Sequence, residues 1–222
     1  MARNKSLNFP GKGQDELPKL SILVAAFNEE LVIAEKIESV FKSNYPIDKF
    51  ELLIGSDNST DQTNEIVESF ADRYPNLVFN AYQKRRGKQN VVNDLYHLST
   101  GSILILTDAN VIFDVNTLLE IARPFQNTQI GLVDTNMINR GMRKEGISQQ
   151  EKAYISREVL IKHQESVVWG SMMGPFGGCY AIRREDYSKV PSNALVDDFY
   201  INMKIFDKGK KAVNNLDAKV YE

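Results

Sequence analysis

A short apolar run, Ile103 to Leu106, stops abruptly at Thr107 and Asp108, and this stretch constrains the fold more than any other. An unbroken apolar run of this length is typical of a strand buried on both faces of a parallel sheet. In open α/β sheets, ligands bind beyond the carboxyl ends of the strands. Asp108, with Asn110 two positions later, therefore offers oxygen ligands for a divalent cation that carries a substrate phosphate. The alternative for Asp108 is a turn residue that caps the next segment, and the stretch taken alone favours it.

Strands and helices alternate along the chain with short links. Such strand–helix–strand units form right-handed crossovers, so we predict a doubly wound, mostly parallel α/β sheet with helices on both faces. The alternation loosens after Asp108, and a Gly- and Met-rich loop over residues 169–178 can approach a ligand closely. The predicted strands are residues 20–26, 50–55, 77–81, 103–108, 130–137, 179–182, 211–213 and 220–222. The predicted helices are residues 28–41, 60–73, 87–98, 117–122, 149–165 and 198–208.

Two of the helix starts carry capping signals. Asn28 directly follows the first predicted strand and is a favoured N-cap residue. Ser59 and Gln62 have the spacing of a capping box, which places the start of the second helix at about Thr60. The first helix is predicted to bury an apolar face made of Leu31, Ile33, Ala34, Ile37, Val40 and Phe41.

The composition is that of an ordinary folded protein. With 222 residues the chain is long enough for one domain with a full core, which we expect over residues 18–222 after a flexible arm at residues 1–17. The formal net charge of −2 gives no overall attraction for nucleic acid, so we expect no nucleic-acid partner. Cys179 is the only cysteine, which excludes an intramolecular disulfide and fits a reducing compartment. No apolar run reaches the length of a membrane span.

Candidate ligand-binding residues also follow other strand ends and helix starts. Phe27, after the first strand, would stack on a flat base, although core packing explains it about as well. Asp57, after the second strand, would accept a hydrogen bond from a base N–H, or else stabilise its own turn. Lys88 stands with Gly87 at a helix start, where backbone N–H groups favour an anion. A solvated basic loop is the alternative there, and it is the more common role of a charged run.

Six segments of the chain resemble, in their order and spacing, the motifs of family 2 glycosyltransferases. These are inverting enzymes of the GT-A fold, and they include the catalytic domains of processive polysaccharide synthases. Each motif is degenerate alone, but six in register are specific. The segments are residues 20–30, 51–63, 86–93, 103–110, 176–184 and 196–209.

The resemblance implies a nucleotide-sugar pocket in residues 18–110 and an acceptor half in residues 111–222. Phe27 and Glu29 lie in a segment similar to the family's aromatic-Asn-Glu turn, which lines the base and ribose pocket. Asp57 matches the second Asp of the Asp-Asp-Gly-Ser-Thr-Asp motif, which contacts uracil, so the implied donor is a UDP-sugar. The implied nucleotide-binding residues are Ala26, Phe27, Glu29, Asp57, Lys88 and Asp108.

The resemblance also implies a metal ion. Asp108-Ala109-Asn110 looks like the family's Asp-x-Asp motif, with an amide in place of the last carboxylate. That replacement weakens the negative charge of the site. Asp108 and Asn110 are therefore the implied ligands of Mn²⁺ or Mg²⁺.

On the acceptor side, Val196-Asp197-Asp198 matches the family's Thr-Glu-Asp, whose last Asp is the general base. An inverting displacement needs a base that takes a proton from the acceptor hydroxyl, so Asp198 is the implied catalytic residue. Without the resemblance, Asp197 and Asp198 would be read as acids that favour a helix N-terminus. Phe176-Gly177-Gly178 looks like the family's glycine-rich acceptor segment, and the implied acceptor is a saccharide or a lipid-linked hydroxyl.

The family's Gln-x-x-Arg-Trp motif does not occur before the chain ends at Glu222, within a predicted strand. We therefore expect a C-terminally truncated piece of a longer protein. In processive relatives that motif precedes transmembrane helices. The expectation is a full-length protein at the cytoplasmic face of a membrane and a fragment that is itself soluble.

These observations predict an inverting glycosyltransferase that moves a sugar from a UDP-sugar to an acceptor hydroxyl in polysaccharide or glycoconjugate synthesis. One alternative is a non-catalytic nucleotide-binding domain of the same fold, which Ser56, Asn110 and the missing motif favour. The other is a sugar-phosphate nucleotidyltransferase. That enzyme would carry a Gly-rich basic loop after the first strand, where this chain has residues 25–29 without one.

Overall fold

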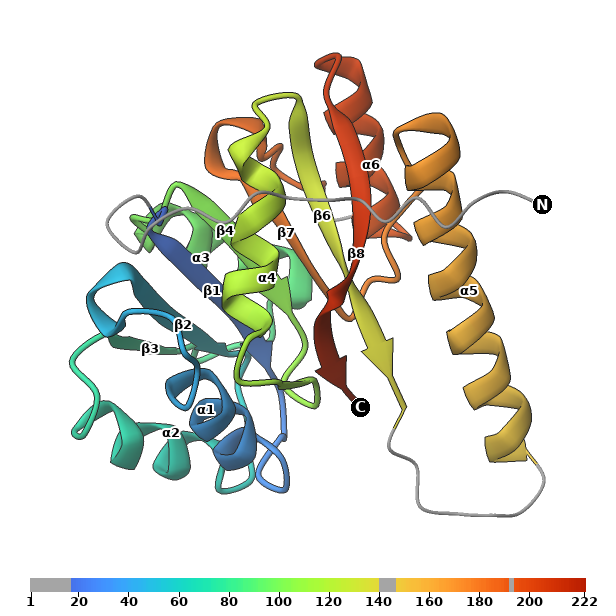
Figure 1. The fold of residues 1–222 in the computed structure, drawn as a ribbon. Helices are drawn as coiled ribbons and strands as arrows, with labels where there is room; N and C mark the ends of the chain where they lie inside the picture. Colours follow the sequence, from blue (N-terminus) through green and yellow to red (C-terminus); the bar gives the residue numbers. More distant parts are fainter. Residues whose placement is uncertain (1–16, 140–146, 192–193) are drawn as a thin grey trace.

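The computed structural model describes residues 17–139, 147–191 and 194–222, with the backbone alone for residues 147–156. The predicted arm therefore lies outside the described residues, apart from Leu17. One sheet of eight strands, in the order β3-β2-β1-β4-β7-β6-β8-β5, runs through this part of the chain (Figure 1). The strands are β1 (Leu20–Ala26), β2 (Phe50–Ser56), β3 (Leu77–Ala81), β4 (Ile103–Thr107), β5 (Ile112–Phe113), β6 (Ile130–Ile138), β7 (Cys179–Arg183) and β8 (Lys211–Tyr221).

The first four long strands form the parallel part of this sheet. β1 pairs in parallel with β2 and β4, and β2 pairs in parallel with β3. β7 is antiparallel to both of its neighbours, β4 and β6, whereas β6 and β8 are parallel. The sheet is thus mixed but mostly parallel, and helices cover both of its faces, which is the GT-A architecture predicted from the sequence.

Alternate residues of the strands enter two separate cores, which explains why the strand sequences are apolar without a break. In β1, Ile22 and Val24 belong to the core under α1, α2 and α4, whereas Leu23 belongs to the core under α3 and α6 (Figure 1). α5 packs along β8 and β6 at the far side of the sheet from β3. The helices are α1 (Ile33–Phe41), α2 (Thr63–Ala71), α3 (Lys88–Leu98), α4 (Thr117–Ala122), α5 (Ile147–Trp169) and α6 (Asp197–Asp207).

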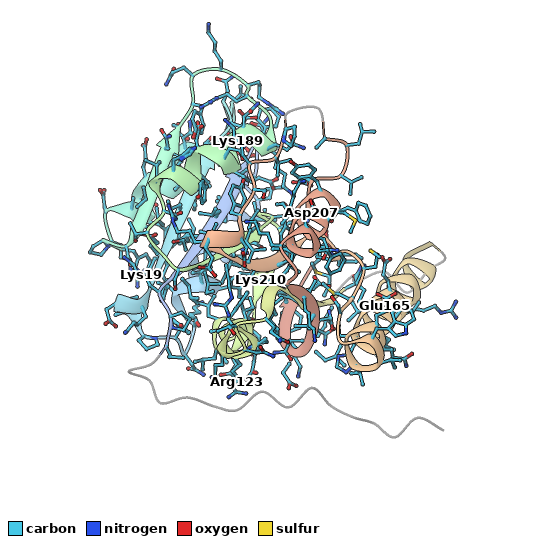
Figure 2. The ribbon with its side chains drawn as sticks, turned by 90° about the horizontal axis from the view of Figure 1, so that it is seen from above. Lys19, Arg123, Glu165, Lys189, Asp207 and Lys210 are labelled. Atoms are coloured by element: carbon cyan, nitrogen blue, oxygen red, sulfur yellow. The ribbon has the colours of Figure 1, made fainter. Side chains whose placement is uncertain are left out.

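Seen from above, α5 with Glu165 forms one flank of the molecule, and the strands near Lys19 form the opposite flank (Figure 2). Glu165 accepts a hydrogen bond from the Met173 N–H at 2.9 Å. The helix therefore holds the beginning of the Gly- and Met-rich loop, which leads back to the centre of the sheet at β7.

Both predicted helix caps are wrong. Asn28 has a positive φ of 55° and lies before α1, which begins at Ile33 without a side-chain cap. Its side-chain oxygen instead accepts a hydrogen bond from the Thr60 N–H at 2.9 Å, so it ties two loops together. Leu31, predicted to lie on the buried face of α1, is 91% exposed because the helix starts after it.

The predicted Ser59–Gln62 capping box does not form either, because α2 begins only at Thr63. Ser59 instead accepts hydrogen bonds from the Asn28 N–H and the Ser56 hydroxyl. β5 was not predicted, and the strands predicted at residues 211–213 and 220–222 are the two ends of one strand, β8.

No helix among the residues that the structure describes is long and apolar enough to cross a membrane.

Candidate active site

The carboxyl ends of β1, β2 and β4 open onto a cavity of about 400 Å³. All of the residues predicted to bind the nucleotide or the metal line this cavity, and three further residues join them. The lining residues are Ala25, Ala26, Phe27, Glu29, Asp57, Arg85, Lys88, Asp108, Ala109 and Asn110. The sheet thus brings together side chains that are up to 85 positions apart in the sequence, from residue 25 to residue 110.

Asp57 is the most buried carboxylate of the cavity, with 3% of its surface exposed. Its two oxygens accept hydrogen bonds from the backbone N–H groups of Arg86 (2.6 Å) and Gly87 (2.9 Å). Gly87 has a φ of +83°, a conformation that a residue with a side chain rarely adopts, and it precedes α3. Asp57 therefore fixes the loop that begins α3, in addition to facing the cavity.

Arg85 belongs to the same loop and was not singled out from the sequence. Its guanidinium carbon lies 3.4 Å from the centroid of the Phe27 ring, and its Nε lies 3.2 Å from Asp57. A flat cation already stacks on the exposed face of Phe27, so this face suits a flat aromatic base as well. The signal in the sequence was the basic run of residues 84–88, which is too common on protein surfaces to identify one residue.

Glu29 is held at the cavity through its backbone, because its N–H donates to the Thr63 hydroxyl at 2.8 Å. Partial burial raises the pKa of the Glu29 carboxyl above its ordinary value of 4.5, and the negative charges of Asp108 and Asp61 raise it further. A cation or a hydrogen-bond donor brought into the cavity would relieve this repulsion.

Asp108 forms an ion pair with Lys88, and the Asn110 amide donates a hydrogen bond to Glu222 at 2.9 Å. The side-chain oxygens of Asp108 and Asn110 are hard ligands of the type that Mg²⁺ and Mn²⁺ take. The described residues contain no group of three or more His, Cys, Asp or Glu side chains that could hold a metal ion. The two oxygens fit a divalent cation only as part of a set that a bound diphosphate completes.

Asp198 approaches the same region from the acceptor half, in the first turn of α6. One of its oxygens accepts a hydrogen bond from the Phe199 N–H at 2.6 Å, and the other lies against Gly177. Burial raises the pKa of the Asp198 carboxyl above 3.8, and the neighbouring charge of Asp197 raises it further, against the lowering effect of that hydrogen bond. A higher pKa makes a carboxylate a stronger base.

Asp197 lines a narrow recess that leads from the cavity toward α6. Lys88 and Asp108 line it from the donor side, and Gly177 and Tyr180 from the acceptor side. Asp198, the predicted base, lines neither the cavity nor this recess, but its carboxylate contacts Gly177 at the wall of the recess.

Two buried polar side chains, Asp134 and Lys162, hold the loop that carries Gly177. The Phe176 N–H donates to Asp134 at 3.3 Å, and the Lys162 ammonium donates to the Gly174 carbonyl at 2.7 Å. Asp134 is completely buried in β6, where it also accepts from the Asn214 amide. Sequence analysis missed Asp134, although a carboxylate inside a predicted strand was a signal.

Comparison with known proteins identifies the family of the chain. The model of the family described as glycosyl transferase family 2 matches residues 21–190, which is most of the chain and includes the cavity. The chain belongs to glycosyl transferase family 2. The resemblance proposed from the six motifs is thereby confirmed.

The chain is similar at low sequence identity to two curated glycosyltransferases. A beta-monoglucosyldiacylglycerol synthase of Nostoc sp. is 30% identical over 159 residues, which cover 71% of this chain and 34% of that protein. The probable glycosyltransferase YdaM of Bacillus subtilis is 26% identical over 211 residues, which cover 87% of this chain and 48% of that protein. The chain thus spans between a third and a half of the length of these two relatives.

Solved structures confirm the GT-A fold. The mannosyltransferase PcManGT from Pyrobaculum calidifontis, in complex with GDP-Man and Mn²⁺, superposes with a TM-score of 0.79 at 24% identity, over 94% of this chain and 58% of that one. Staphylococcus aureus TarS in complex with UDP-GlcNAc gives a TM-score of 0.65 at 20% identity, over 92% and 58%.

Proposed function

We propose that this chain is the catalytic domain of an inverting glycosyltransferase that transfers a sugar from a nucleoside-diphosphate sugar, with UDP as the expected nucleotide, to an acceptor hydroxyl. The observation that carries the proposal is the meeting of two groups of side chains at one site. Phe27, Asp57, Lys88 and Asp108, from the first half of the chain, line the cavity. Asp197, from the second half, lines the adjoining recess, and its neighbour Asp198 contacts Gly177 there. Membership of the family supports transfer chemistry.

The donor subsite would use the cavity residues in distinct roles. The base would stack on the Phe27 ring in place of Arg85, and Asp57 would accept a base N–H. Glu29 and the Ala26 backbone region would border the ribose. Lys88 would exchange its ion pair with Asp108 for the diphosphate, whose negative charge grows as the sugar leaves.

A divalent cation, when bound, would neutralise charge on the leaving diphosphate. Asp108 and Asn110 would hold it, and their hard oxygens and position at the end of β4 support this role. The relative PcManGT, with Mn²⁺ and GDP-Man in its structure, makes a metal-assisted reaction the natural expectation. The proposal leaves Mn²⁺ and Mg²⁺ equally suited, because both take oxygen ligands.

Asp198 would take the proton from the acceptor hydroxyl as that oxygen attacks the anomeric carbon, on the face opposite to the departing diphosphate. The raised pKa and the position against the loop of residues 170–178 support this role. The acceptor would be a saccharide or a lipid-linked hydroxyl, and the Nostoc relative, named for a glucosyldiacylglycerol, supports the lipid-linked class. A membrane location of the full-length protein belongs to the same proposal.

Neither alternative is favoured. A nucleotidyltransferase does not fit a family 2 match. A non-catalytic domain does not explain why Asp57 and Asp108 line the cavity while Asp197 lines the recess beside it. The deciding experiment measures nucleotide release. The chain is incubated with UDP-glucose, UDP-GlcNAc or GDP-mannose and a panel of glycolipid and oligosaccharide acceptors, with Mn²⁺ or with EDTA.

We expect one donor to release its nucleoside diphosphate in the presence of an acceptor and of Mn²⁺, and we expect binding of that nucleotide by calorimetry. Asp198→Asn serves as the matched control, because it should bind the nucleotide and release it about two to four orders of magnitude more slowly. Formation of pyrophosphate from a sugar phosphate and a nucleoside triphosphate would overturn the proposal, and so would the absence of binding by every nucleotide tested.

A further inference from the structure

Lys36 is a lysine in an unusual place. It lies in the middle of α1 and is completely buried, although lysine is among the residues least often found inside proteins. Its ammonium group donates hydrogen bonds to the Thr107 hydroxyl at 2.9 Å and to the Val111 carbonyl at 2.6 Å. It also lies 3.8 Å from the centroid of the Phe113 ring.

These two acceptors stand on either side of the Asp108–Asn110 segment. Thr107 is the last residue of β4, and Val111 is the first residue after the segment. A second contact from α1 lies close by, because the Ser39 hydroxyl accepts a hydrogen bond from the Phe113 N–H at 3.2 Å. One helix therefore holds both ends of the loop whose side chains face the cavity.

The burial of Lys36 is costly, and packing alone does not explain it. Its hydrogen-bond acceptors are neutral, and no ion pair with a carboxylate is found for it among the described residues. Burial lowers the pKa of the Lys36 ammonium from 10.5 to about 7, against the raising effects of Cys179 and Asp108. An apolar side chain of the same length would fill this space without the cost of desolvating a charge.

We propose that Lys36 is a positioning residue that fixes the Asp108–Asn110 loop in the conformation that binds the metal–diphosphate unit of the donor. This inference rests on the proposed function, because it concerns the same site. Ile33, Ile37 and Val40 already anchor α1 in the core, so the lysine is not needed to hold the helix. The second shell around a metal site sets the orientation of its ligands, and its loss commonly weakens metal binding by about 10- to 100-fold.

The test compares Lys36→Met with Lys42→Met in the 222-residue chain. Methionine keeps the length of the side chain and removes the two hydrogen bonds. Lys42 is the C-cap residue of the same helix, is exposed and pairs with Glu38, so it is the matched control. Two measurements are made: hydrogen exchange of the amides of Asp108 and Val111 without any ligand, and UDP affinity with Mn²⁺ and with EDTA.

We expect Lys36→Met to speed exchange at these two amides and to weaken UDP binding by about 10- to 100-fold in Mn²⁺ only, with affinity in EDTA unchanged. Lys42→Met should change neither. If the role of Lys36 were purely structural, Lys36→Met would weaken UDP binding equally with Mn²⁺ and with EDTA. Unchanged exchange, or an unchanged Mn²⁺-dependent gain in affinity, would overturn the inference.

If Lys36→Met does not fold, Thr107→Val replaces it in the test, since it removes one hydrogen-bond acceptor of Lys36 and keeps the lysine. Thr107→Val should lower the gain in UDP affinity that Mn²⁺ gives over EDTA, but by less than Lys36→Met. An unchanged gain would refute the role of Lys36. The ligand-free exchange measurement does not depend on the proposed function. If the wild-type chain binds no nucleotide, the proposed function is contradicted. The hydrogen exchange of the Asp108 and Val111 amides would still test the role of Lys36.

Discussion

The carboxylate of Asp198 packs directly against Gly177, so that a Cβ atom added to Gly177 would lie only 2.5 Å from Asp198 Oδ2. Gly177 also has a φ of +99°, which residues with a side chain rarely adopt. The Asp198 carboxylate can therefore occupy its observed position only because residue 177 has no side chain.

Gly177→Ala should displace Asp198 and lower turnover much more than nucleotide affinity, because the donor cavity is lined by other residues. It should also lose about 1–3 kcal/mol of stability through backbone strain. Gly209→Ala is the matched control, since Gly209 has a φ of +68° and no atom within 4 Å of its added Cβ. Chemical denaturation and initial rates measure both variants, and equal rates for the two would show that the Gly177 contact does not matter.

Asp198→Asn should lower turnover by about two to four orders of magnitude, because an amide cannot take the acceptor's proton. Nucleotide affinity, measured by calorimetry, should not change. Because the pKa of Asp198 is raised above 3.8, the wild-type rate should begin to fall at a pH above 3.8 when the solution is made more acidic. The residual rate of Asp198→Asn should not show this fall. Asp197→Asn should be the milder change, and the reverse order would assign the base to Asp197.

Asp57→Ala should weaken UDP binding by at least about 1 kcal/mol, since it leaves a polar partner of the base unpaired. The loss has a second source, because the N–H groups of Arg86 and Gly87 lose their acceptor and the loop before α3 is released. Asp94→Ala is the control, as Asp94 pairs with the Arg86 side chain and does not line the cavity. Wild-type affinity in Asp57→Ala would remove this residue from the nucleotide site.

Mn²⁺ should bind the free chain weakly and bind it tightly when UDP is present, because Asp108 and Asn110 supply only two protein oxygens. Asp108→Ala should abolish the UDP-dependent part of the binding. Titration followed by electron paramagnetic resonance distinguishes free from bound Mn²⁺. Tight binding without UDP, or equal binding by the variant, would contradict the assignment of these ligands.

Asp134 should make stability depend on pH in a defined direction. Burial raises its pKa from 3.8 to about 7, so between these values the folded state holds a proton that the unfolded state has released. The stabilising contribution is thus fully present below pH 3.8 and is lost as the pH rises through about 7. Denaturation of Asp134→Asn over the same range should show a smaller decline than the wild type, and parallel curves would show that Asp134 titrates normally.

Much of the donor half could be predicted from the sequence, because its strands are unbroken apolar runs that end at polar residues. The bounds of β1, β3 and α4 agree with the prediction. The unpredicted part of β8, residues 214–219, has four polar residues among six, and the burial of its two asparagines depends on contacts made across the sheet. Asn214, for example, donates hydrogen bonds to Asp134 and to the Thr135 carbonyl. The sequence around Asn214 does not predict these distant partners.

In the site too, residues placed by their own strand could be predicted, whereas residues placed by partners far away in the sequence could not. Residues directly after strands, such as Asp57 and Asp108, were found because the ends of parallel strands converge on one edge of a sheet. Lys36 was missed because a lysine in an amphipathic helix is normally exposed, and its partners follow it by 71 and 75 positions. Arg85 was missed because four other basic or glycine residues surround it within residues 84–88.

The seam between the two halves is a ladder of backbone hydrogen bonds rather than a hinge. β4 and β7 pair over five residues, from Ile103 with Arg183 to Thr107 with Cys179. The halves that carry Asp108 and Asp198 consequently cannot swing apart without breaking the sheet. Entry and departure of a ligand would therefore involve the segments that border the site, residues 84–88 and 170–178, while the sheet keeps β4 and β7 at a fixed distance.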